Sequence, residues 1–242
     1  MAITHISSVA AAGTGFNNGT TATATVAGTV AADDLIILCV ATTNGAGTYT
    51  PSDNKGGNTY TAAAARLEVG DGFSRVYYAK VVNGGTNFQV TMTLSGASYG
   101  TIIVHHISGQ DLSAPLDKVI NNYQSAPGTG TNAITSTAET PTTGGQYLLG
   151  FVTQSTFTTS TFSAGTSVAY TAGQLNAGQA DFSQSTEYFI QGAAASVAAT
   201  FTQTVDIGTA TWLVTFKAAG GGGDLSVGLG AIGEPVVGGS TF

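Results

Sequence analysis

The stretch Gly100-Thr101-Ile102-Ile103-Val104-His105-His106-Ile107 decides the fold class of this chain. A similar stretch follows further on, Thr209-Ala210-Thr211-Trp212-Leu213-Val214-Thr215-Phe216. Both are rich in β-branched and aromatic residues, carry almost no charge, and are bounded by turn residues, as is typical of a strand in the middle of a sheet. The two stretches lie about 110 positions apart, and most of the chain repeats at that spacing.

Several further pairs of segments match at a similar spacing and in the same order along the chain. They are 6–9 with 120–123, 21–26 with 133–138, 33–38 with 145–150, 76–78 with 186–188, and 90–93 with 199–202. The offset shortens slightly along the chain, as trimmed loops would produce. The pattern favours a duplicated unit, with copies at about 3–108 and 118–217. The alternative is that threonine-rich strands resemble one another without a common origin.

Short alternating segments separated by Gly and Asn turns predict an all-β fold. The expected strands are 3–9, 20–27, 34–42, 58–65, 74–81, 88–94 and 100–108, and then 118–124, 132–138, 146–154, 166–171, 185–191, 198–203 and 209–217. We expect a two-sheet antiparallel β-sandwich, jelly-roll-like and built from an internal duplication, over residues 1–218. The join at 108–117 is short and contains two leucines, which favours one shared core over two separately linked domains.

Composition narrows the classes of function. Only 8% of the residues are charged, and the formal net charge is -7, which argues against a nucleic-acid binder. No apolar run approaches the roughly 20 residues of a membrane helix, and no signal peptide is expected at the start. The single cysteine, Cys39, lies in an apolar strand, so we expect a buried, inert thiol.

The chain also resembles a known group of proteins. The features that carry the likeness include the strand 33–38, the segment Ser52-Asp53-Asn54-Lys55-Gly56-Gly57-Asn58-Thr59-Tyr60, and the closing Trp212-Leu213-Val214-Thr215-Phe216-Lys217. Over residues 3–219 it is similar to β-sandwich domains of about 200 residues found in bacteriophage virion or tail-associated proteins and in bacterial surface proteins. The resemblance implies a fold and a setting, and it brings no catalytic residues with it.

Two motifs match enzyme signatures without their structural context. Gly96-Ala97-Ser98-Tyr99-Gly100 has the spacing of a nucleophile elbow, but a strand follows it where that motif needs a helix, so we predict a hairpin turn. Gly228-Leu229-Gly230-Ala231-Ile232-Gly233 has the dinucleotide spacing, but Pro235 follows and leaves no helix for the phosphates. We therefore predict no catalytic residues and no cofactor.

Three kinds of residue are candidate ligands for metals or sugars. His105 and His106 are adjacent on a strand, so they face opposite sides of the sheet, and we expect one packed and one exposed imidazole. Acidic turn residues at 33–34, 53–54 and 71 are expected to cap their own turns instead of binding calcium. Aromatic residues in or near loops could stack on a glycan: Tyr49, Tyr60, Phe73, Phe157, Phe162 and Phe182.

These observations favour a non-enzymatic structural protein of a bacteriophage virion surface, such as a capsid decoration or tail-associated protein. The alternative is a glycan-binding adhesin or receptor-binding module. A third class, a hydrolase using Glu68, Glu139 or Glu187, would need two of these carboxylates to face each other. We expect self-association into a trimer or larger symmetric array, contacts with other virion proteins, and no nucleic-acid or membrane partner.

The segment 219–242 differs from the rest of the chain. A glycine run leads into an apolar tail whose large side chains are expected to dock on a neighbouring subunit or another virion protein: Leu225, Val227, Leu229, Ile232, Val236, Val237 and Phe242. Strand addition at residues 224–229 is the mode that we favour. A frayed terminus is the alternative.

Overall fold

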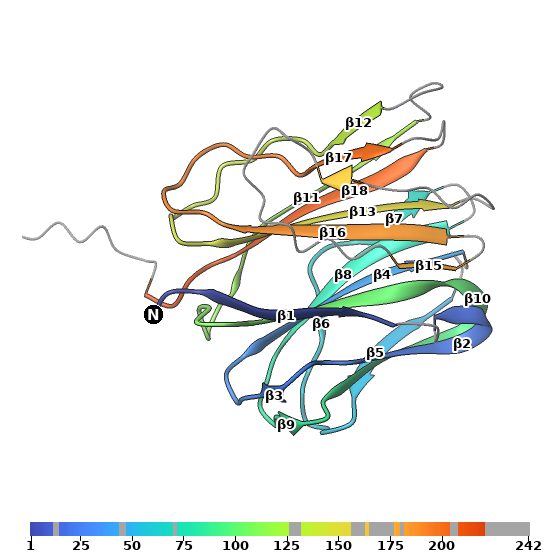
Figure 1. Ribbon diagram of the computed structural model, residues 1–242, viewed down its shortest axis with the longest axis horizontal. Helices are drawn as coiled ribbons and strands as arrows, with labels where there is room; N and C mark the ends of the chain where they lie inside the picture. Colours follow the sequence, from blue (N-terminus) through green and yellow to red (C-terminus); the bar gives the residue numbers. More distant parts are fainter. Residues whose placement is uncertain are drawn as a thin grey trace, which may run out of the picture.

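The computed structural model describes residues 1–11, 15–43, 47–69, 72–125, 132–155, 163–164, 177–179, 182–203 and 208–220. In these ranges all of the helix and strand structure consists of β-strands, with no helix, and the strands form several antiparallel sheets (Figure 1). The predicted all-β class is confirmed. No helix in the described ranges is long and apolar enough to cross a membrane.

The first half of the chain forms an eight-stranded sheet and a small two-stranded sheet. The larger sheet contains β1 (Thr4–Ala10), β10 (Gln89–Ser108), β4 (Leu35–Thr42), β8 (Gly72–Lys80) and β6 (Thr61–Ala62) in spatial order. β2 (Phe16–Thr25) and β5 (Tyr49–Asp53) pair with β10, and β7 (Leu67–Val69) pairs with β8. The smaller sheet pairs β3 (Thr29–Val30) with β9 (Gly85–Thr86).

The second half forms a five-stranded and a three-stranded sheet. The first contains β11 (Leu116–Gln124), β18 (Thr209–Phe216), β13 (Tyr147–Ser155), β16 (Phe182–Ile190) and β15 (Ala177–Gln179) in spatial order. The second contains β12 (Asn132–Thr135), β17 (Thr200–Gln203) and β14 (Ser163–Ala164). The predicted strand at 166–171 lies outside the described residues.

The two halves have the same pairing pattern. β1–β10–β4–β8 in the first half matches β11–β18–β13–β16 in the second. An irregularity in strand pairing also occurs in both halves. The pairing register shifts between His5 and Ser7 in β1, and between Leu116 and Lys118 in β11. This register makes Leu116 the counterpart of His5, so the sequence match of 6–9 with 120–123 is displaced by three residues from the structural one.

The predicted strands 88–94 and 100–108 are one strand, β10, and the hairpin turn predicted between them is wrong. Gly100 explains the continuity, because its φ of +137° bends the strand without ending it. The part of β10 before the bend pairs with β2 and β5, and the part after it pairs with β1 and β4. β10 therefore passes from one layer of the structure into the next.

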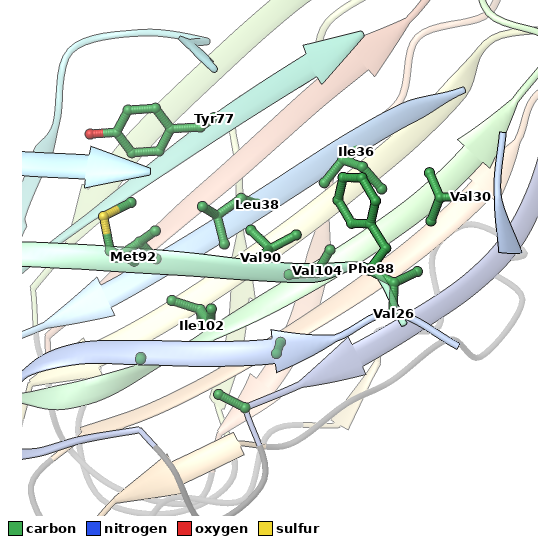
Figure 2. Close-up of a cluster of buried hydrophobic side chains, with 14 of the residues drawn as sticks. Val26, Val30, Ile36, Leu38, Tyr77, Phe88, Val90, Met92, Ile102 and Val104 are labelled. Carbon is green, nitrogen blue, oxygen red and sulfur yellow. The ribbon is translucent and has the colours of Figure 1, made fainter. Parts of the chain in front are cut away.

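The bend lets β10 pack against itself. Figure 2 shows Val90 and Met92, from before the bend, in the same cluster as Ile102 and Val104, from after it. Ile36 and Leu38 of β4 complete the contact (Figure 2). This cluster forms the first apolar core and covers one face of the sheet β1–β10–β4–β8.

The opposite face of that sheet packs on the five-stranded sheet, so both halves contribute to a second core. Leu35, Ile37 and Cys39 of β4 meet side chains such as Phe151 and Trp212 there. Alternate residues of β4 thus enter different cores, and all eight of its residues are buried. Burial raises the pKa of the Cys39 thiol, in agreement with the predicted inert cysteine. A third core, around Ile134, Leu148, Phe201 and Leu213, lies between the five- and three-stranded sheets.

The only tryptophan makes one of the hydrogen bonds that join the two larger sheets. Trp212 is fully buried, and its Nε1 donates to Ser74 Oγ over 2.8 Å. A Trp212→Phe substitution removes the donor and part of the ring, so we expect it to lower the free energy of unfolding by about 2 kcal/mol. Urea unfolding of Trp212→Phe, Ser74→Ala and the double variant measures the coupling, and strictly additive losses would contradict a bond between these side chains.

Candidate functional site

A group of histidine, tyrosine and threonine side chains lies between the two larger sheets. We call His5, His105, Tyr147, Thr186 and Tyr188 the inter-sheet polar cluster. His105 Nδ1 lies 2.9 Å from the Tyr147 hydroxyl, and its Nε2 lies 2.8 Å from Thr186 Oγ1. His5 stacks on Tyr188 with ring centroids 3.8 Å apart. Because a neutral imidazole offers one donor and one acceptor, His105 can satisfy both hydroxyl contacts without a charge.

The cluster occupies only one end of the interface between the halves. β16 lies near β10, whereas β11 and β18 lie near β7, so the two sheets pack with opposite strand order. The strand registers assign each cluster residue a counterpart at the other end. For His5, His105, Tyr147, Thr186 and Tyr188 the counterparts are, in the same order, Leu116, Val214, Leu35, Val76 and Tyr78. All five counterparts belong to the second apolar core.

The electrostatics of the cluster favour neutral groups. Burial, followed by the nearby His5 charge, lowers the pKa of His105 to about 3, and burial raises the pKa of Tyr147 well above its usual value. His5 is half-buried, and its pKa is also lowered by burial and by His106. Near neutral pH the His105 imidazole is therefore uncharged, and its two nitrogens serve as hydrogen-bonding groups between the halves.

The second histidine of the pair is also buried, so the prediction of one exposed imidazole is wrong. His105 and His106 do point to opposite faces of β10, but apolar layers cover both faces of this sheet. His106 Nε2 lies 2.7 Å from Asp34 Oδ2, which also accepts a hydrogen bond from the Ala31 N–H over 2.8 Å. Asp34 thus links the turn that precedes β4 to the strand β10.

The nucleophile-elbow serine has no access to a substrate. Ser98 lies inside β10, is 3% exposed, and donates to the Tyr99 carbonyl over 3.0 Å. The glutamates considered for hydrolysis have separate partners. Glu187 Oε1 accepts from the Thr200 N–H, Glu139 lies 3.6 Å from Lys118, and Glu68 lies 3.6 Å from Arg66. The glycine motif at 228–233 lies outside the described residues.

The predicted turn capping by acidic residues is confirmed at Asp53. Its Oδ1 accepts from the N–H groups of Lys55 and Gly56, each over 2.9 Å, and its Oδ2 accepts from Asn58 Nδ2 over 3.0 Å. Within the described ranges, no group of three or more His, Cys, Asp or Glu residues is arranged to hold a metal ion. Asp71 lies outside those ranges.

The loop aromatics considered for glycan stacking are largely packed where the structure describes them. Phe73 is fully buried, Tyr49 meets its ring edge-on at 4.3 Å, and Tyr60 packs against the first core. Phe157 and Phe162 lie outside the described residues, as does the side chain of Phe182. Phe73 therefore has no exposed ring face for a glycan, and Tyr49 is only partly exposed.

A surface groove that the sequence did not predict lies at the join between the halves. We call it the junction groove. It has a volume of about 600 Å³, and its lining comes from three segments, 57–61, 78–82 and 112–116. Tyr78 and Leu116 line the groove and also pack against the second core. Val82 and Leu112 line it as well, with 59% and 45% of their surface exposed. Leu112 and Leu116 were the feature of the sequence that pointed to this groove, since two leucines in the join predict packing there.

The residues predicted for partner docking in the apolar tail all lie outside the described residues: Leu225, Val227, Leu229, Ile232, Val236, Val237 and Phe242. Comparison of the chain with protein-family models, with curated proteins and with solved structures finds no match. Any assignment of function therefore depends on the chain's own residues.

Proposed function

We propose that this chain is a non-enzymatic structural protein of a bacteriophage virion surface, either a capsid decoration protein or a tail-associated one. The observation that carries the proposal is the use of its reactive side chains. His105, His106, Asp34 and Tyr147 are buried, and each makes a hydrogen bond to another segment of the chain or to the other half. Such groups stabilise a building block but are out of reach of a substrate.

The proposed architecture is a duplicated, jelly-roll-like β-sandwich over residues 1–218. The shared pairing order β1–β10–β4–β8 and β11–β18–β13–β16 supports the duplication. The core between these sheets supports the view that the two copies form one body. A body of this kind can act as a rigid unit that repeats over a particle surface.

The proposed assembly is a trimer or a larger symmetric array. Among the described residues, β1 pairs only with β10 and β11 only with β18, so each is the edge of its sheet there. Charged side chains often protect such edges, and β11 carries Asp117 and Lys118, whereas β1 carries no Asp, Glu, Lys or Arg. Self-association is one way in which sheet edges of this kind are covered.

Mass spectrometry of particles purified from cells that make this chain tests the proposal. We expect the chain in the particle fraction at a fixed ratio to the major shell protein, and retained after a high-salt wash. The soluble fraction of the same lysate is the control. Detection only in the soluble fraction would show that the chain is no virion component. Light scattering of the purified chain then gives the number of copies in the assembly.

A further inference from the structure

We propose that the junction groove is the docking site for the apolar tail, residues 224–237, of a neighbouring copy of this chain. The inference rests on the proposed assembly and names the surface that accepts the tail. Its basis is the chemistry of the groove, the rigidity of its walls, and the position at which the tail leaves the described body.

The groove is apolar at its rim and has one cation. Val82 and Leu112 are two of six large hydrophobic side chains that are exposed in the described residues, and both line this one groove. Lys80 also lines it, and its Nζ lies 3.3 Å from Asp33 Oδ1, with both side chains well exposed. Such a surface pair is weak, so Lys80 is free to meet another carboxylate.

The tail has matching chemistry. Between residues 224 and 237 it carries Leu225, Val227, Leu229, Ile232, Val236 and Val237, and its only charges are the carboxylates of Asp224 and Glu234. Exposed to water, these large side chains forgo the free energy that burial would release. An apolar acidic segment therefore fits an apolar groove that contains a lysine.

One wall of the groove is held in place by an asparagine. Asn58 Oδ1 accepts from the N–H groups of Val82, over 2.7 Å, and Asn83, over 3.0 Å. Asn83 Nδ2 in turn donates to the Gly56 carbonyl over 2.9 Å. These bonds fix the segment 57–61 against the end of β8 and leave the Val82 side chain facing outward.

The other wall is held by Asp111. Its Oδ1 accepts from Ala114 N, Ser113 Oγ and Ser113 N, at 2.8 to 2.9 Å, and these bonds lower the pKa of Asp111 to about 2. Lys217 N also donates to the Pro115 carbonyl over 2.8 Å. Since both walls are fixed beforehand, a segment that binds between them loses little free energy to ordering the groove.

The exit of the tail lies beside the same leucine. A smaller pocket of about 300 Å³, lined by Met1, Gly109 and Ala219 among others, shares Leu112 with the groove. Residues 217–219 run antiparallel to 109–115, since Lys217 N donates to Pro115 O and Ala219 N to Gly109 O. The chain thus leaves in the direction from Pro115 to Gly109, away from its own groove. To enter that groove the tail would have to turn back at Gly220, so a neighbouring copy is the favoured acceptor.

Photo-crosslinking of the full-length chain tests the assignment. A benzophenone amino acid at position 112 is compared with the same probe at position 6, because Leu112 and Ile6 are equally exposed, at 45% each. Ile6 lies on the free edge of β1, so position 6 also reports strand addition at that edge. Mixing ¹⁵N-labelled and unlabelled chains before irradiation separates products between chains from products within one chain.

We expect position 112, and not position 6, to crosslink to peptides from 224–237, with mixed-isotope products among them. Three outcomes would overturn the inference: tail products from position 6 alone, same-isotope products only, or no tail product from position 112. If no tail product forms and a glycan array detects binding that Leu112→Asp abolishes, the groove is instead assigned to a saccharide.

Substitution gives an independent measurement. Leu112→Asp and Val82→Asp should each weaken self-association by about tenfold or more, because a buried apolar contact becomes a carboxylate. Ile190→Asp, at an exposed side chain of β16 that is on neither of the edge strands β1 and β11, should change it by less than about threefold, and thermal melts show that each variant is folded. The proposed function can fail separately. If the chain is absent from particles but its tail crosslinks to position 112, only the virion role is refuted. If the chain is present in particles but gives no tail product at position 112, only the docking role of the groove is refuted.

Discussion

Replacing Gly100 with valine is expected to prevent the first half of the chain from folding stably at 37 °C. A Cβ at this position would lie 2.1 Å from the Ala41 carbonyl oxygen and 2.7 Å from Thr42 Cα, and both obstacles are backbone of the neighbouring strand β4. The φ of +137° is also a conformation that a β-branched residue rarely adopts. We expect a loss of at least about 3 kcal/mol in the free energy of unfolding, measured by urea titration.

Gly28→Ala is the matched control for this substitution. Gly28 has a φ of +78°, but a Cβ there would meet nothing within 4 Å. It therefore isolates the cost of the backbone conformation, about 1 kcal/mol. A Gly100→Val variant no less stable than Gly28→Ala would show that a side chain is tolerated at position 100 and would contradict the predicted clash with β4.

Acidification is expected to destabilise the protein well above the pH at which its carboxylates titrate. The pKa of His105 falls from 6.5 to about 3 on folding, so between these values the unfolded chain binds a proton that the folded chain does not. Stability is then complete above pH 6.5 and is lost as the pH falls, by up to about 1.4 kcal/mol per pH unit. Between pH 6.5 and 4.5 we expect a loss of about 2–3 kcal/mol, measured by urea unfolding at each pH.

His105→Gln separates this titration from other acid effects. Glutamine keeps a donor and an acceptor for Tyr147 and Thr186 but takes up no proton, so the variant should be less stable at pH 7 and show a much shallower slope. His5, whose pKa is also lowered, leaves a residual slope in the same direction. An unchanged slope in His105→Gln would exclude His105 as the titrating group.

Much of the local structure was predictable because it depends on neighbouring residues. The apolar runs at 34–42 and 209–217 predicted β4 and β18 closely, and Asp53 caps its turn through residues two to five positions away. The continuity of β10 was not predictable, because two glycines and a serine within five residues indicate a turn. Pairing with strands that are distant in sequence, such as that of Gly100 with Phe16 and Thr42, keeps the strand extended. The burial of His106 depends on Asp34, 72 residues earlier.

The candidate sites were harder to predict for the same reason. The inter-sheet polar cluster combines residues from β1, β10, β13 and β16, and nothing in their local sequences distinguishes His105 from an exposed histidine. The junction groove depends on Asn58 and Asp111, whose hydrogen bonds fix loops from different parts of the chain. Periodicity and turn chemistry report contacts within a few residues, whereas both sites arise from contacts between distant segments.

The unequal ends of the interface between the halves determine which half can pair with which. If two first halves from different molecules came together in the same geometry, His105 of each would face Leu35 and Val76, with no partner for either ring nitrogen. Two second halves would place Tyr147 and Thr186 against Val214, and both hydroxyls would lack a partner. Each unsatisfied buried group costs about 1–3 kcal/mol. Both like-with-like pairings would thus leave buried polar groups without partners, so the interface favours a first half opposite a second.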